Sequence, residues 1–286
     1  MLEDVSRIVA RAEHEAGNGH IDDVLNILRG LCLMDFGALL LEMPSAAYPN
    51  LSMMLPRMAS DEVQVGWTGA SGYQLLQGTA DFTRMTQLHF ERLSCRKLQN
   101  RRILDYGCGY GRIARLMYWF VNPSDYTGVD PWDRSIELCR QDGLLGNFIQ
   151  SEYLPDTLPL GDSKFDLIFS FSVFTHTSLS ATRKALHVLR KYIHDDGVLV
   201  ITVRPIDYWS TVERISPEQR QMQMQLHRSQ GFSYIPDTFP VVEDEVLFGD
   251  TSIDPRWLER EFPEWRVSGY DRGIDAWQTL MFLTPR

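Results

Sequence analysis

Three glycines at alternate positions follow an acidic residue near the middle of the sequence. The stretch from Ile103 to Arg112 reads Ile-Leu-Asp-Tyr-Gly-Cys-Gly-Tyr-Gly-Arg. The apolar pair is typical of the end of a buried strand, and the apolar spacing from Ile113 to Phe120 predicts that a helix follows. Glycine suits a tight strand-to-helix turn because it adopts positive φ and lets a ligand reach bare backbone. The N–H groups at the helix start then offer donors to that ligand.

A second acidic residue stands at the end of the next predicted strand. Residues 126–129 form that strand, and Asp130 follows about 20 residues beyond the glycines. A carboxylate there can accept hydrogen bonds from both hydroxyls of a ribose, and the alternative is a carboxylate that only caps the next helix. The joint spacing favours ribose. The dinucleotide fingerprint Gly-x-Gly-x-x-Gly fits less well, because it needs a glycine where this chain has Arg112.

The pattern Asp105-x-Gly107-x-Gly109-x-Gly111 resembles the first motif of the class I S-adenosylmethionine-dependent methyltransferases. The stretch from 158 to 176 is similar to the fourth strand of that family and the loop that leaves it. The resemblance covers roughly residues 74–286. It implies S-adenosyl-L-methionine as the cofactor and an α/β fold, a doubly wound, mostly parallel, Rossmann-like sheet of seven strands.

The resemblance also implies which residues contact the cofactor. They lie in the glycine-rich motif, after the second, third and fourth strands, and in a stretch before the core that folds over the cofactor in many relatives. In that order they are Asp105, Gly107, Cys108, Gly109, Gly111, Arg112, Asp130, Pro131, Ser151, Glu152, Tyr153, Phe171, Ser172, Trp67 and Tyr73. Two points stay open. The segment after the third strand is longer than in the family, so which of residues 151–153 meets adenine is undecided. Trp67 could instead be a buried tryptophan that pins a surface loop.

His176 is the candidate catalytic residue. It lies a few residues past the predicted fourth strand, where a neutral imidazole could take a proton from an acceptor hydroxyl during methyl transfer. The alternative is a histidine that hydrogen-bonds the backbone and shapes the loop. A metal role is unsupported, because no cluster of acids and histidines falls at the ends of the strands.

Strands and helices alternate, which predicts a parallel sheet covered on both faces. Residues 2–29 read as two short amphipathic helices, residues 44–57 as a loop, residues 61–73 as irregular structure and residues 74–98 as a long helix. We expect residues 1–60 to form an N-terminal helical extension and residues 61–286 the methyltransferase domain. An insertion at about 205–251 would build the acceptor pocket, or would only pack as a lid.

Composition limits the partners. The 286 residues carry a net charge of −10 with scattered basic residues, which disfavours nucleic acid. The sequence shows neither a signal-peptide plan nor an apolar run long enough for a membrane span, and its four cysteines form no paired motif. We therefore expect a cytoplasmic protein that acts on a small-molecule acceptor, with a possible homodimer through the N-terminal helices.

Three functions remain in competition. The first is methyl transfer to a small molecule or sugar, at oxygen. The second is a non-catalytic protein that binds S-adenosylmethionine or serves in assembly. The third is a nicotinamide-dependent oxidoreductase, which the residue at position 112 disfavours.

Overall fold

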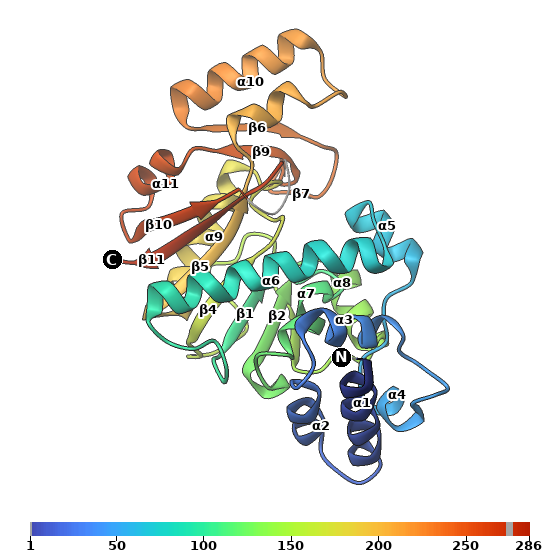
Figure 1. Ribbon diagram of the computed structural model, residues 1–286. Helices are drawn as coiled ribbons and strands as arrows, with labels where there is room; N and C mark the ends of the chain where they lie inside the picture. Colours follow the sequence, from blue (N-terminus) through green and yellow to red (C-terminus); the bar gives the residue numbers. More distant parts are fainter. Residues whose placement is uncertain (1, 273–276) are drawn as a thin grey trace. The chain divides into compact units, whose positions relative to one another are not determined.

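The computed structural model describes residues 2–272 and 277–286, which divide into two compact parts (Figure 1). The first part holds residues up to Glu91 and Arg96–Gln150, and the second holds Arg92–Cys95 and Ser151–Arg286. The elements from the N-terminus to the end of the first part are α1 (Leu2–Ala16), α2 (Ile21–Leu28), α3 (Leu33–Leu41), α4 (Pro49–Met54), α5 (Asp61–Thr68), α6 (Gly72–Ser94), β1 (Ile103–Tyr106), α7 (Arg112–Met117), η1 (Pro123–Asp125), β2 (Tyr126–Asp130), α8 (Asp133–Gln141) and β3 (Asn147–Gln150).

The second part continues the alternation of strand and helix and adds a group of short elements after its second strand. Its elements are β4 (Phe165–Ser170), α9 (Leu179–Tyr192), β5 (Ile193–Val203), η2 (Ile206–Ser210), α10 (Pro217–Gln230), β6 (Phe232–Pro236), β7 (Val241–Val242), β8 (Glu245–Val246), β9 (Gly249–Ile253), α11 (Pro255–Glu261), β10 (Trp265–Asp271) and β11 (Thr279–Pro285). The last two strands of the second part, β10 and β11, pair antiparallel.

Seven strands form the main sheet, in the order β10-β11-β5-β4-β1-β2-β3. Strands β1, β2 and β3 pair in parallel, as do β4 and β5, whereas β11 runs antiparallel to β5. Every residue of β1, β2 and β4 is buried. Strands buried on both faces are rich in apolar residues, and the polar residues of these three strands, such as Asp105 and Thr127, are buried with them. The predicted doubly wound, mostly parallel sheet with N-terminal helices is confirmed.

Two helices replace segments that the sequence predicted to be irregular. α5 lies within 61–73, because Ser60 caps its start by accepting a hydrogen bond from the Val63 N–H and Gly69 ends it with a φ of +77°. Gly69 is therefore a helix stop, which is a common use of glycine. α4 lies within the predicted loop 44–57, because Pro49 occupies the first helical turn, where the missing N–H does no harm.

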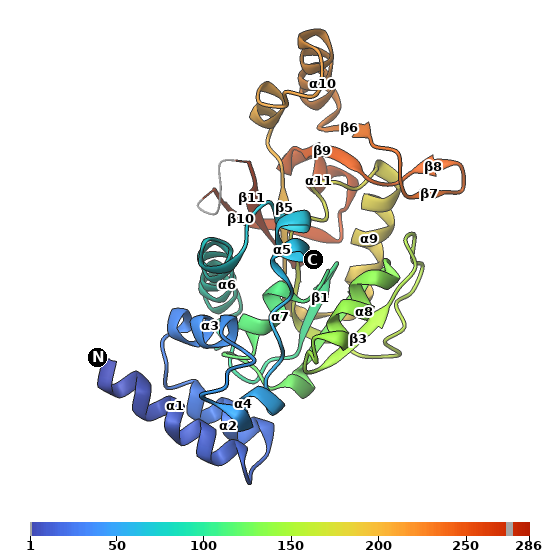
Figure 2. The ribbon, with the colours of Figure 1, turned by 90° about the vertical axis from the view of Figure 1, so that its right-hand side faces the viewer.

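The N-terminal helices dock on the end of α7. The Arg29 guanidinium donates to the carbonyls of Tyr118 and Val121 at 2.8–3.3 Å, and the Trp119 indole N–H donates to the Leu31 carbonyl at 2.9 Å. The two predicted amphipathic helices are confirmed as α1 and α2, which pack against each other (Figure 2). These contacts fix the extension to its own chain.

The segment between β5 and α11 has a small core of its own. Trp209 is fully buried with Val212 and Ile215, and its indole N–H donates to the Ser252 hydroxyl at 2.7 Å. Strands β6 and β9 pair antiparallel, and α10 packs on β6 (Figure 2). The tryptophan of this segment therefore packs inside it, and the role of the segment as acceptor pocket or lid stays a prediction.

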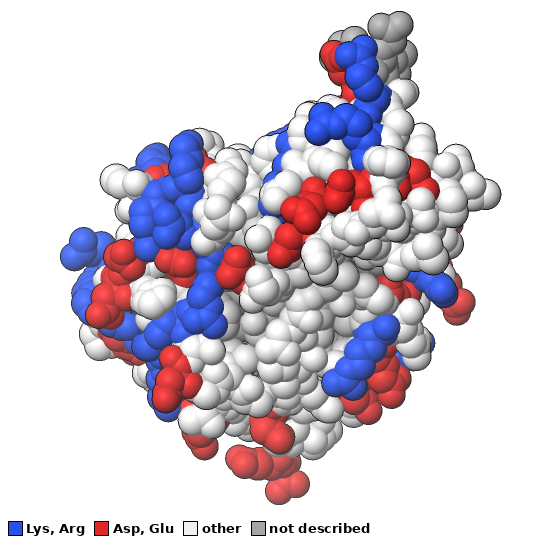
Figure 3. All heavy atoms as spheres, turned by 90° about the horizontal axis from the view of Figure 1, so that it is seen from below, with Lys and Arg blue, Asp and Glu red and all other residues white. Residues whose placement is uncertain are grey.

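Charges of both signs share the surface. On the face that Figure 3 shows, the blue atoms of lysine and arginine are interspersed with the red atoms of aspartate and glutamate. Of the helices formed by the described residues, none is both long enough and apolar enough to span a membrane.

Candidate functional site: a glycine-rich loop and a histidine cluster

The glycine-rich loop, residues 107–111, connects β1 to α7 in a left-handed backbone conformation. Gly109 has a φ of +54° and Gly111 a φ of +73°. A Cβ on Gly111 would lie 1.9 Å from the Leu144 side chain, and one on Gly109 would lie 3.3 Å from the Trp67 ring. The positive φ favours glycine at both positions, and a Cβ at either one would require the neighbouring side chain to move. This confirms the predicted tight turn with positive φ.

Asp130 holds this loop from the end of β2. One carboxylate oxygen accepts from the Gly109 N–H and the other from the Trp132 N–H, each at 2.9 Å. Trp132 is itself the N-cap of α8 and no side chain caps that helix, so Asp130 is not a helix cap in the usual sense. Burial raises the pKa of Asp130, while its two backbone hydrogen bonds oppose the shift. The Ser135 hydroxyl also lowers the pKa of this carboxylate by hydrogen bonding. Because each carboxylate oxygen can accept two hydrogen bonds, acceptor capacity still remains for a ribose hydroxyl.

The other charged and thiol groups of the motif bind protein atoms. Asp105 is 1% exposed and accepts from the Tyr126 hydroxyl at 2.6 Å, and burial raises its pKa to about 7. The Cys108 thiol is buried beside Cys139, and burial raises its pKa. Arg112 donates to the Thr79 hydroxyl on α6 at 2.6 Å. These three side chains thus bind protein groups around the loop, and direct contact with the cofactor stays a prediction for each of them.

An aromatic cluster, Trp67, Tyr110 and Trp132, covers the loop. The rings of Trp67 and Trp132 stack with centroids 4.9 Å apart and planes 15° apart, and the Tyr110 ring meets Trp67 edge-on at 5.6 Å. Among the described residues, the buried Tyr110 hydroxyl finds no hydrogen-bond partner. The structure thus brings Trp67 to the loop on a helix, α5, rather than on an irregular segment. By contrast, Tyr73 is 63% exposed at the start of α6.

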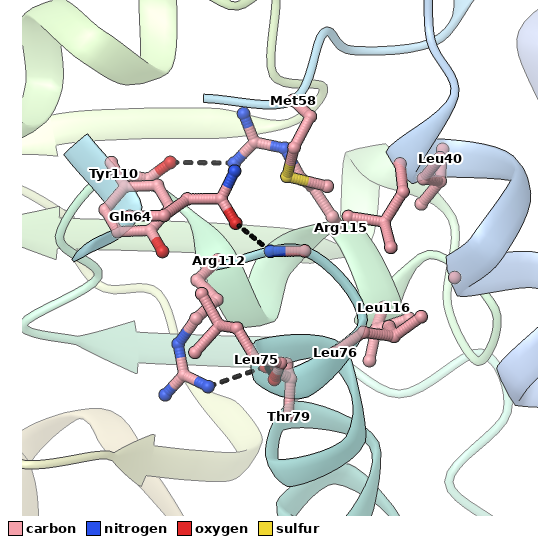
Figure 4. Close-up of a pocket in the computed structure, with 13 residues that line it drawn as sticks. Leu40, Met58, Gln64, Leu75, Leu76, Thr79, Tyr110, Arg112, Arg115 and Leu116 are labelled. Atoms are coloured by element: carbon pink, nitrogen blue, oxygen red, sulfur yellow. Dashed lines mark hydrogen bonds between the residues drawn. The ribbon is translucent and has the colours of Figure 1, made fainter. Parts of the chain in front are cut away.

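A small cavity lies next to this loop and is lined by residues such as Tyr110, Arg112, Gln64 and Thr79 (Figure 4). Its volume is about 20 Å³, which is room for about one water molecule. The cavity is therefore too small to receive a nucleoside.

The remaining predicted cofactor residues are distributed over both parts. In the first part, Pro131 is half-buried, and its carbonyl accepts from the Gln150 amide at 3.2 Å. In the second part, Ser151 is buried and its hydroxyl is without a hydrogen-bond partner among the described residues, whereas Glu152 is exposed. Ser172 has a φ of +60° and donates its N–H to the Thr202 hydroxyl at 2.6 Å. Tyr153 and Phe171 are half-buried.

His176 lies in a network of the second part that we call the His176 cluster: His176, Arg204, Tyr208, Arg214 and Asp250. Nδ1 of His176 is 2.7 Å from the Gly249 carbonyl oxygen, which can only accept, so Nδ1 carries the proton. Nε2, 3.2 Å away from Arg204, then accepts from that guanidinium. Burial and the Arg204 charge lower the pKa of His176 to about 4. The imidazole is therefore neutral at pH 7, and the lone pair of Nε2 accepts the hydrogen bond from Arg204.

Arg204 and Asp250 connect the rest of this cluster. The Arg204 guanidinium donates to the Thr175 carbonyl at 2.7 Å and to Asp250, and it stacks on the Tyr208 ring at 4.2 Å. Arg214 donates two further hydrogen bonds to Asp250. Although burial opposes it, the two arginines lower the pKa of Asp250. The cluster is a charge-paired, hydrogen-bonded unit, and its geometry favours the loop-shaping role of His176 over the general-base role.

Sequence reasoning did not find Trp132, Tyr110 or Arg204. Trp132 and Tyr110 stand beside predicted positions, and an aromatic side chain next to a ligand-binding turn is the signal that could have found them. Arg204 directly follows a buried strand, but its partners lie 28 and 46 residues away in the sequence, and no local pattern indicates them.

The loop fits S-adenosylmethionine. Asp130 has acceptor capacity for the ribose hydroxyls, the bare backbone of Gly109 is contacted by a flat ring, and Tyr110 offers a buried hydroxyl that lacks a partner among the described residues. These groups would hold the ribose and cover the cofactor. When bound, the cofactor supplies a methyl group that its sulfonium has already activated.

Comparisons with known proteins agree with this site. A family model described as "Methyltransferase domain" matches residues 104–201. Phthiotriol/phenolphthiotriol dimycocerosates methyltransferase 1 of Mycobacterium ulcerans is 30% identical over 112 residues, which are 38% of this chain and 40% of that protein. The chain thus matches about two fifths of the length of that relative. The crystal structure of an S-adenosylmethionine-dependent methyltransferase from Clostridium acetobutylicum superposes with a TM-score of 0.50 at 11% identity, covering 78% of this chain and 95% of that one.

The chain carries a methyltransferase domain, and its seven-stranded sheet has the fold of the class I S-adenosylmethionine-dependent methyltransferases. The methyl donor of that class is S-adenosyl-L-methionine.

Proposed function

We propose that the protein methylates an oxygen atom of a small hydroxylated molecule, such as a natural product or a sugar. The observation that carries this proposal is the polarity of the His176 cluster. Two guanidinium groups, a carboxylate, a phenol ring and a neutral imidazole stand together in the segments that follow β4 and β5. Although these groups are paired with one another, their hydrogen-bonding capacity and the phenol ring suit a hydroxylated acceptor better than an apolar one.

The residues of this chain contribute mainly by placement. Asp130 and the glycine-rich loop bind the cofactor, and the Trp67–Trp132 pair excludes water from it. Effective placement of two reactants lowers the barrier of a transfer reaction by several kcal/mol, roughly 7–11 in well-oriented cases. A histidine with a pKa of about 4 is a weak base at neutral pH, so we expect the acceptor proton to leave without help from His176.

The curated relative supplies a further candidate acceptor. Its name specifies phthiotriol and phenolphthiotriol dimycocerosates. The match spans 40% of that protein, and a long-chain polyol is therefore one of several acceptors to be tested.

The test is a turnover assay with isotopically methyl-labelled S-adenosylmethionine and three matched acceptor sets: sugars and phenols, long-chain polyols, and primary amines. Release of S-adenosylhomocysteine with a labelled O-methyl product, identified by mass spectrometry, is the expected result. A labelled N-methyl product would overturn the oxygen proposal. Tight binding of S-adenosylhomocysteine without turnover on any set would favour the non-catalytic alternative.

We further infer a cytoplasmic protein that forms a homodimer through the N-terminal helices. The four cysteines are free thiols, which supports a reducing compartment. Light scattering of the eluting protein tests the dimer, and a monomer mass at micromolar concentration would contradict it.

A further inference from the structure

A second arginine of the glycine-rich loop region, Arg115, donates five hydrogen bonds to protein groups. It lies on α7 and is 1% exposed. Its Nη1 donates to the carbonyls of Tyr110 and Gly111 at 2.8 and 3.0 Å. Its Nε and Nη2 donate to the Arg57 carbonyl at 3.1 and 2.6 Å, and Nη2 also donates to the Asp142 carboxylate at 2.9 Å. A guanidinium has five N–H groups, and all five are used.

These bonds join three segments. The Tyr110 and Gly111 carbonyls belong to the loop, Arg57 precedes α5, and Asp142 ends α8. The Arg57 N–H also donates to the Asp142 carbonyl at 2.8 Å, which closes the link between the last two segments. Figure 4 shows the Arg115 side chain directed toward Tyr110, with a dashed line at their hydrogen bond. Arg115 therefore connects the loop to the segment that precedes α5, the helix that carries Trp67.

The direction of the carbonyls matters for ligand binding. In a trans peptide the C=O and the N–H point in opposite directions. When Arg115 holds the Gly111 carbonyl, it turns the N–H of the next residue away from the guanidinium. That N–H is the first of α7, and the first N–H groups of a helix have no partner within it. The Arg115 backbone N–H also donates to the Gly111 carbonyl, at 3.4 Å. The guanidinium thus acts together with the helix backbone to fix which way the donors of the loop face.

We propose that Arg115 is a positioning residue for the cofactor: it fixes the glycine-rich loop in the conformation that binds S-adenosylmethionine. The proposal rests on cofactor binding at this loop. Lysine cannot take over this role of Arg115. An ammonium group has three donors without planar geometry and cannot hold three carbonyls and a carboxylate at once.

Arg29 offers a matched control at the other end of α7. Its guanidinium also donates five hydrogen bonds, to the Tyr118 and Val121 carbonyls and to the side chains of Asn26 and Asn122. It therefore resembles Arg115 in chemistry but does not contact the loop. Replacement of either arginine by lysine should destabilise the fold, and only one of the two replacements should affect the cofactor.

The experiment is calorimetric titration of S-adenosylhomocysteine into the parent, Arg115→Lys and Arg29→Lys proteins at a temperature well below every melting transition. We expect the Kd of Arg115→Lys to rise about tenfold, the effect of losing one charged hydrogen bond. The Kd of Arg29→Lys should stay within about twofold of the parent. An unchanged Kd in folded Arg115→Lys overturns the proposal, as does an equal rise in both variants.

If Arg115→Lys does not fold, the same titration of Asp142→Asn tests the positioning role. The asparagine keeps an acceptor but removes the charge that holds the guanidinium, so we expect a Kd about two- to fivefold higher. An unchanged Kd would again overturn the positioning role. Failure of the parent protein to bind S-adenosylhomocysteine would instead remove the premise of cofactor binding, so the two failures are distinguishable.

Discussion

At the glycine-rich loop, burial outweighs the hydrogen bonds and the Arg112 charge that act on two carboxylates, so the pKa values of Asp105 and Asp130 are raised. In the His176 cluster, two guanidinium groups outweigh burial and lower the pKa of Asp250. The loop offers mainly backbone groups and carboxylate acceptors, whereas the cluster is held by bonds between charged side chains. The loop is thus suited to bind a ligand with backbone and acceptors, and the cluster to hold a fixed arrangement of side chains.

The largest effect should come from breaking the cluster. Arg204→Met leaves the Thr175 carbonyl and one side of Asp250 without a partner, and removal of one member of a buried ion pair costs about 3–5 kcal/mol. We expect a loss of about 3 kcal/mol in the free energy of unfolding, measured by urea titration. Arg183→Met, which breaks a surface pair with Glu261, is the control and should cost less than about 1 kcal/mol. Equal losses in the two variants would show that the cluster is no more stabilising than a surface pair.

At the loop, Asp130→Ala should affect binding more than stability. The ribose loses its acceptor, and the Gly109 N–H loses its partner. The Kd for S-adenosylhomocysteine should rise roughly ten- to a hundredfold, which corresponds to about 1.5–3 kcal/mol. Asp133→Ala is the control: Asp133 is the first residue of α8, and its replacement should leave the Kd for S-adenosylhomocysteine unchanged. Parental affinity in Asp130→Ala would end the ribose assignment.

The contributions of Asp105 and His176 to the free energy of unfolding should change with pH in opposite directions. Asp105, with a folded pKa of about 7, keeps its proton in the native state where the unfolded chain has lost it, so its contribution falls as pH rises from about 4 to 7. His176, with a folded pKa of about 4, stays neutral where the unfolded chain is protonated, so its contribution falls as pH drops below about 6.5. The contribution to the free energy of unfolding is at most about 4 kcal/mol for Asp105 and at most about 3 kcal/mol for His176.

Single variants should separate these contributions. Relative to the parent, Asp105→Asn should gain melting temperature as pH rises from 4 to 7, and His176→Gln should gain it as pH falls from 6.5 to 4. Melting curves across this range give the result. Parallel curves for parent and variant would mean that the residue titrates alike in the folded and unfolded chains.

The smallest effect is expected for catalysis by His176. If the residue shapes its loop, His176→Gln should lower turnover less than about tenfold and keep the pH–rate profile, with cofactor affinity near that of the parent. A general base would instead contribute about 10²–10⁴-fold and a limb of the profile in the histidine range. His187→Gln, which changes a surface histidine paired with Glu264, is the control. A collapse of turnover that is confined to His176→Gln would restore the base hypothesis.

The parts of the fold that sequence predicted correctly depend on neighbours in the chain. Gly109, Gly111 and Asp130 act through turn geometry and strand ends, which spacing reveals, and the apolar strands follow from burial on both faces. α5 was missed because Gly66 and Gly69 suggested loop, although the serine cap and Gly69 as a stop are helix signals. The partners of His176 were out of reach, since Gly249 and Arg204 approach it only through the pairing of β9 with the loop after β4.

The stacked Trp67–Trp132 pair also gives the protein an optical property. Two indoles whose centroids lie 4.9 Å apart couple their electronic transitions, and this coupling weakens steeply with separation. The pair should therefore contribute an exciton band to the far-ultraviolet circular dichroism, which Trp132→Phe would abolish. Trp67 lies on α5, and Trp132 follows Asp130 at the end of β2. A ligand that separates the two rings would therefore weaken this band, so its binding could be measured without a label.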